Sequence, residues 1–94
     1  MPSEDEAMKW VADGVVRQLV AGELEPEAAT ERLRGLASRV MNLNRPAWED
    51  LEVFVSLSFD WDSAAEGYLD RDAVREAVLS EAQVLLSRGG VRTR

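Results

Sequence analysis

The sequence contains no cysteine and no histidine. Together these absences exclude disulfide bonds, thiolate nucleophiles, haem attachment motifs, zinc-finger sites and imidazole general bases. No serine has a histidine to activate it, and no glycine-rich loop opens a helix to hold a phosphate. Acidic side chains on an open surface have ordinary pKa values and make poor general acids. We therefore expect a protein that is not an enzyme and that has no cofactor and no metal.

No stretch of the chain reaches the roughly 18–20 consecutive apolar residues that span a bilayer. The N-terminus begins with an acidic run, residues 4–6, whereas a secretory signal begins basic and becomes apolar. The sequence therefore predicts a cytoplasmic location and no membrane partner.

The chain of 94 residues is acidic, with 11 Lys and Arg against 18 Asp and Glu and a net charge of −7. Its hydrophobic content of 46% is too high for a disordered chain, and its length suits one modest core. We expect a single helical domain over residues 1–94. Binding of nucleic acid is disfavoured because contact with phosphates needs a basic surface.

Apolar residues at helical spacing predict four amphipathic helices and no strand with sustained alternation. The first is expected to begin at Ser3, which forms a capping-box pattern with Glu6, and to end at Gly22. The second is expected to have Pro26 in its first turn and to end near Asn42.

The third helix is expected from near Pro46 to about Trp61, with a strand over 51–57 as the alternative because Val and Phe favour sheets. A polar connector is expected over 60–70, with Asp70 as the cap of the fourth helix. Residues 89–94 are expected to form a frayed tail after the Gly-Gly pair. The predicted fold is all-α, an antiparallel four-helix bundle or a close variant.

Charge is distributed unevenly along the chain. Residues 46–70 hold seven acids and no base, whereas residues 32–45 hold four arginines and no acid. One interpretation is that the two segments pair inside the fold. The other is that the acids of 46–70 form a surface that binds a basic protein partner, because no cation within that segment neutralises them.

Aromatic residues flank these acids. Trp48 and Phe59 are expected in the core, whereas partial exposure of Trp61 and Tyr68 would make them anchors of an interface. Trp10 is expected at the edge of the bundle. The candidate partner-binding residues are Glu49, Glu52, Asp60, Trp61, Asp62, Glu66 and Tyr68.

A calcium loop is a weaker alternative. If Gly67 is the glycine of the sharp turn, Asp62 takes loop position 1, but Ala64 takes position 3 and Ala73 takes position 12. Position 12 needs a bidentate Glu, so the motif predicts at most a degenerate calcium-responsive domain.

Two pieces of the sequence, residues 16–29 and 54–62, resemble the small bacterial immunity proteins similar to the colicin D immunity protein. The resemblance implies an all-helical bundle that binds and blocks a cytotoxic nuclease by placing acidic side chains against its basic catalytic face. The residues that would do this here are Glu49, Glu52, Asp60, Asp62 and Glu66.

The third predicted helix is apolar on nearly all sides, and a four-helix monomer leaves part of such a surface uncovered. The sequence therefore also allows a homodimeric interaction module whose apolar helix faces pair across a two-fold axis. Monomer and homodimer both stay open at this point.

Overall fold

The computed structural model describes residues 4–42 and 48–92, and these form four α-helices. The helices are α1 (Glu4–Val20), α2 (Pro26–Asn42), α3 (Glu49–Ala65) and α4 (Arg71–Ser87). The predicted all-α class is confirmed. The alternative of a strand over 51–57 is wrong, because all of these residues lie in α3. Among the described helices, none combines the length and apolarity that crossing a membrane requires.

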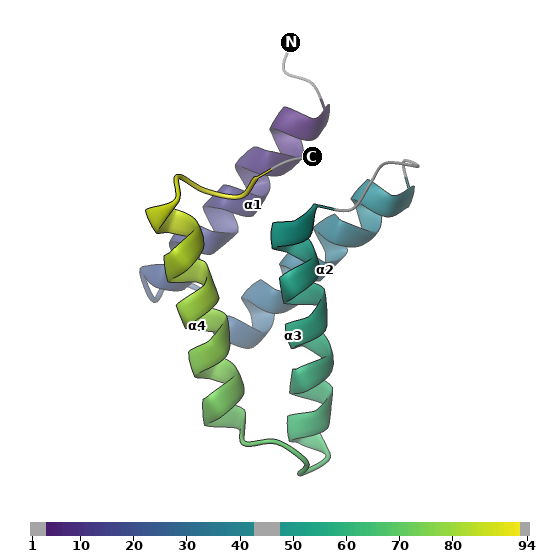
Figure 1. Ribbon diagram of the computed structural model, residues 1–94, viewed down its shortest axis with the longest axis vertical. Helices are drawn as coiled ribbons and strands as arrows, with labels where there is room; N and C mark the ends of the chain where they lie inside the picture. The colour runs from purple at the N-terminus through teal and green to yellow at the C-terminus, as the bar shows by residue number, and fades with distance from the viewer. Residues whose placement is uncertain (1–3, 43–47, 93–94) are drawn as a thin grey trace.

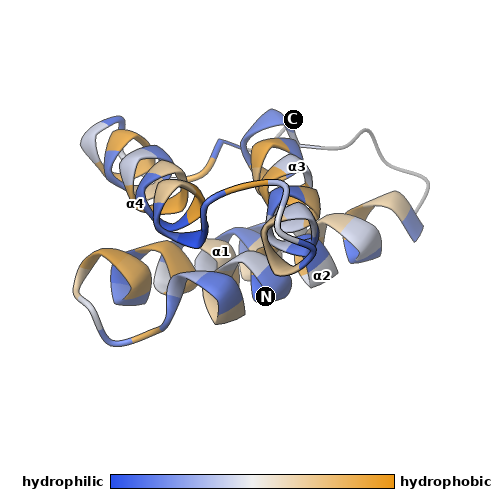
Figure 2. Cartoon of the chain, turned by 90° about the horizontal axis from the view of Figure 1, so that it is seen from below, coloured by the Kyte–Doolittle hydropathy of each residue, from blue (hydrophilic) through white to orange (hydrophobic). Residues whose placement is uncertain are grey.

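The helices form two antiparallel hairpins that stack as two layers (Figure 1). The α1–α2 hairpin lies behind the α3–α4 hairpin in this view, and the perpendicular view separates the same two layers (Figure 2). Across the layers α2 packs on α3 and α1 packs on α4, whereas no described α-carbon of α1 lies within 8 Å of one of α3. The arrangement is a four-helix bundle, as predicted.

Glycines end three of the helices in the same way. After α1, the amides of Gly22 and Glu23 donate to carbonyls of the last turn, and Gly22 has φ 78°. Gly67 after α3 and Gly89 after α4 repeat this pattern. The predicted ends of the first and fourth helices are therefore confirmed. The predicted connector over 60–70 is wrong in part, because α3 continues to residue 65.

Local signals also set the beginnings of the helices. Asp70 caps α4, with its carboxylate accepting from the amide two residues later at 2.9 Å. Pro26 is the first residue of α2, as predicted. Helix α3 begins after Trp48, later than expected, and the proposed starts at Ser3 and Pro46 lie outside the described residues.

The core lies between the two hairpins and contains apolar residues from all four helices. Trp48 is 2% exposed and belongs to this core, which confirms its predicted place. Phe59 was predicted to be buried, and this prediction is wrong, since it is 55% exposed. Helix α3 has apolar residues on nearly every side, so its neighbours decide which of them is covered.

The segment that follows α4, residues 88–92, is ordered and is called the strap below. The prediction of a frayed tail is wrong for its described part, because Val91 is 1% exposed and lies in the core. The strap crosses from the end of α4 towards α1 and α3 (Figure 1). The physical reason is that two of its backbone amides donate hydrogen bonds to buried carboxylates far away in the sequence, those of Asp13 and Asp50.

Candidate binding surface

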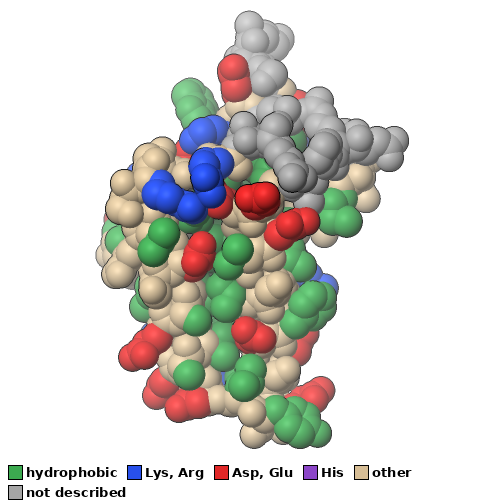
Figure 3. Space-filling view, in the orientation of Figure 1, with side chains coloured by type: hydrophobic (Ala, Val, Ile, Leu, Met, Phe, Trp, Pro, Cys, Tyr) green, Lys and Arg blue, Asp and Glu red, His purple; other side chains and the backbone are tan. Residues whose placement is uncertain are grey.

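Part of the predicted partner-binding set lies on the side of α3 that faces away from the other helices. At 100° per residue, Glu49, Glu52, Ser56 and Asp60 fall on one side of this helix. The first three are exposed and Asp60 is half-buried. We call this side, together with Val53 and Phe59, the α3 outer face. Both acidic and hydrophobic side chains are visible over α3 in the space-filling view (Figure 3).

Two apolar side chains on the α3 outer face are accessible to a partner. Phe59 is 55% exposed and Val53 is 38% exposed. The guanidinium of Arg34, on α2, lies 5.5 Å from the centre of the Phe59 ring, which is a distance suited to a cation–π contact. Arg34 thus contacts part of the Phe59 ring, and the rest of the ring stays exposed to solvent.

The acids of this region differ in how they are neutralised. No described residue forms an ion pair with Glu52, Asp60, Asp62 or Glu66. Among the described arginines of the basic segment 32–45, Arg39 pairs with Glu4 and Arg34 with Glu31, so neither neutralises 46–70.

Asp50 behaves differently from its neighbours. It is 4% exposed, and its Oδ1 accepts from the guanidinium of Arg88 at 3.0 Å. Its Oδ2 accepts from the backbone amide of Arg92 at 2.8 Å. Internal pairing therefore applies to Asp50, although its cations come from beyond α4 and not from the basic segment 32–45 that the sequence suggested.

Trp61 is the largest correction to the predicted set. Partial exposure was expected, but the side chain is buried, with the residue 5% exposed. Its indole N–H donates to the hydroxyl of Thr30, on α2, at 3.2 Å, and the guanidinium of Arg71 lies 5.4 Å from its ring. Helix α3 continues one turn beyond Trp61, so this residue does not lie at a helix end. Its ring faces α2, as the hydrogen bond to Thr30 shows, and has a structural role.

The remaining candidates lie near the end of the α3–α4 hairpin. Asp62 and Glu66 are exposed, and Tyr68 in the connector is 78% exposed. Asp62 is about 200° around the helix from Asp60, from the same 100° spacing. The structure thus places Glu49, Glu52 and Asp60 together and puts Asp62, Glu66 and Tyr68 in a second group at the hairpin end.

The residues proposed for a calcium loop do not form one. Asp62 lies in the last turn of α3 and Ala73 in the first turn of α4, so only the short connector between them is non-helical. In the described part of the chain, no three acidic side chains are grouped closely enough to hold a metal ion.

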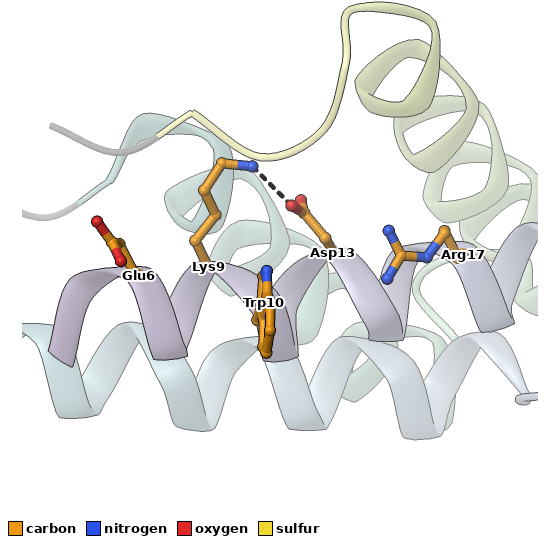
Figure 4. A pocket seen from close by; sticks show the side chains of 5 residues that line it. All are labelled: Glu6, Lys9, Trp10, Asp13 and Arg17. Carbon is orange, nitrogen blue, oxygen red and sulfur yellow. Dashed lines mark hydrogen bonds and ion pairs between the residues drawn. The ribbon is translucent and has the colours of Figure 1, made fainter. Parts of the chain in front are cut away.

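A depression on α1 was not found from the sequence. It is lined by Glu6, Lys9, Trp10, Asp13 and Arg17, which recur at helical spacing along one flank (Figure 4). Lys9 Nζ donates to Asp13 Oδ2 at 2.6 Å, so these two charges neutralise each other. Trp10 is 78% exposed, consistent with a place at the edge of the bundle.

Comparisons of this chain with protein-family models, with curated proteins and with solved structures give no match.

Proposed function

We propose that this chain is a non-catalytic protein that binds another protein through the α3 outer face and the α3–α4 hairpin end. The observation behind the proposal is the combination of two accessible aromatic side chains, Phe59 and Tyr68, with acids that form no ion pair with a described residue. These acids are Glu52, Asp60, Asp62 and Glu66. Exposed aromatic rings provide contact area, and uncompensated charge speeds association with an oppositely charged surface.

The partner in this proposal presents a basic surface. A basic nuclease domain of a toxin, held inactive in the cytoplasm, has the charge that this face complements, and it is the partner class that the sequence resemblance implies. Acidic side chains over a basic catalytic face would exclude the nucleic-acid substrate, because they would pair with the same cations that bind its phosphates. The chain itself supplies no reaction, and its role is to cover the partner's site.

The test compares two charge-reversal variants of the full chain. Glu52→Lys with Asp60→Lys changes the α3 outer face, and Glu23→Lys with Glu76→Lys removes as much negative charge elsewhere. Proteins captured from the source cell by wild type are identified, purified and measured again by calorimetry. We expect the first variant to lose binding by at least about tenfold, or about 1.4 kcal/mol, and the control to keep it. Equal loss in both variants, or no basic partner, would contradict the proposal.

A homodimer is the second candidate, and the exposure of Val53 and Phe59 on α3 favours it. In a two-fold pairing of this face, Glu52 and Asp60 of one copy would approach the acids of the other, which costs free energy. Sedimentation at tens of micromolar distinguishes the two functions: a monomer favours the basic partner, and a dimer that dissociates on Phe59→Asp substitution favours self-association.

A further inference from the structure

The strap is held by two buried carboxylates that lie on different helices. The amide of Val91 donates to Oδ1 of Asp13, on α1, at 2.7 Å, and the amide of Arg92 donates to Oδ2 of Asp50, on α3, at 2.8 Å. Asp13 is 9% exposed and Asp50 is 4% exposed. Two consecutive backbone amides are thus bound by the protein as a peptide ligand would be, through the main chain.

The same site also selects side chains. A Cβ placed on Gly90 would lie 2.7 Å from Oδ1 of Asp13, so this position accepts only glycine. The next residue, Val91, is 1% exposed among the core residues. The guanidinium groups of Arg88 and Arg92 lie 3.0 Å and 3.6 Å from the two oxygens of Asp50. The preferred segment is therefore basic, with glycine, a valine-sized residue and arginine in sequence.

The walls of this site do not depend on the strap for their positions. Helices α1 and α3 each pack on both α2 and α4, so each has neighbours other than the strap. Within the strap, Gly89 and Gly90 cap the end of α4 and both have positive φ, so residues 91 and 92 follow a joint with backbone freedom that other residues lack. The strap can therefore leave while the four helices keep their packing.

We propose that the space beneath the strap is a peptide-binding site, occupied in cis by residues 88–92 of the same chain, which accepts the same segment in trans from a second copy. The ligand class is a short, basic peptide with the order glycine, small aliphatic residue, arginine. The cis segment competes at the effective concentration of a short linker, which is in the millimolar range. The site is separate from the α3 outer face and does not rest on the function proposed above.

The first test uses the full chain with Val91→Asp, which brings a carboxylate beside Asp13 and Asp50 and so expels the strap. A capped synthetic peptide of residues 88–92 is added up to about 1 mM, the scale of the cis competition, and amide NMR shifts are followed. We expect saturable shifts beside Asp13 and Asp50 in the variant, and at least about tenfold weaker binding to wild type.

Matched controls separate recognition from simple charge attraction. A peptide with aspartate in place of valine keeps both arginines, and it should produce no saturable shifts. Adding Asp50→Asn to the Val91→Asp chain should weaken binding of the wild-type peptide. A folded Val91→Asp chain that shows no saturable shifts would overturn the proposal, as would equal binding of the two peptides.

Hydrogen exchange in the wild-type chain tests whether the strap opens locally, and it can be measured even if Val91→Asp fails to fold. A removable strap lets the Val91 and Arg92 amides exchange by local opening, so we expect them to be protected but at least about tenfold faster than the amide of Phe54 in the core. Exchange as slow as that of Phe54 would mean that the strap opens only on global unfolding, and exchange without protection would mean that it is not bound. Either result overturns the proposal.

Discussion

Asp50 and Glu52 are two positions apart in α3, and their surroundings are opposite. Asp50 is buried and accepts hydrogen bonds from the strap, whereas Glu52 is exposed on the α3 outer face with no ion pair to any described residue. Two positions correspond to about 200° around a helix. The side of the helix therefore decides whether an acid stabilises the fold or remains accessible to a partner, and the number of acids in a segment does not.

The largest expected effect tests the buried side of this comparison. Asp50→Ala removes the acceptor of two hydrogen bonds, one from the guanidinium of Arg88 and one from the backbone amide of Arg92. Because both guanidinium groups can return to water, we expect a loss of about 2 kcal/mol in the free energy of unfolding, the scale of a hydrogen bond to a charged group. Urea denaturation measures it. Glu52→Ala is the matched control, and a similar loss there would remove the distinction.

The same comparison applies to two aromatic residues of α3, Trp61 and Phe59. Trp61→Phe removes the hydrogen bond to Thr30 and some buried volume, so we expect a loss of about 1.5 kcal/mol in unfolding free energy. Phe59→Leu keeps an apolar side chain at an exposed position, and its effect should stay within about 0.5 kcal/mol. Equal losses in thermal unfolding would show that the two rings are covered to the same extent.

The third effect sharpens the role of the buried acids. Asp13 and Asp50 lie on α1 and α3, whose described α-carbons stay more than 8 Å apart, yet both bind the strap. In a double-mutant cycle of Asp13→Ala and Asp50→Ala, the second substitution should cost less than it does alone, with a coupling of about 1 kcal/mol. Additive losses in urea denaturation would mean that each acid acts without the strap.

The smallest effect belongs to the exposed side. Glu52→Lys with Asp60→Lys should change the unfolding free energy by no more than about 0.5 kcal/mol, because neither residue has an ion-pair partner among those described. Circular dichroism during heating measures this. A larger loss would mean that these acids stabilise the fold, and it would count against their role as a binding surface.

Local signals made much of the fold predictable. Pro26, Asp70, Gly22 and Gly89 act within one turn of their own helix, and the structure bears out all four. The burial of Trp61 and the exposure of Phe59 were not predictable, because an apolar residue occurs at nearly every angle of α3. Which ring is covered depends on where α2 lies, and no local pattern contains that information.

The candidate site was predicted less well than the fold. Glu49, Glu52 and Asp60 share a side of α3 because helical spacing alone places them there. The strap was missed because its partners are 78 and 42 positions away, and a glycine pair followed by a short polar end is typical of fraying. The one signal available was Val91, an isolated apolar residue after the glycine pair.

The position of the strap after α4 has a consequence for the order of folding during synthesis. The amides that join α1 and α3 belong to residues 91 and 92, which a ribosome adds only after all four helices have been made. A chain that ends before residue 91 contains the sequences of all four helices but leaves Asp13 and Asp50 without these two donors. Docking of the strap on the bundle therefore follows the synthesis of the four helices, and limited proteolysis would distinguish the two stages.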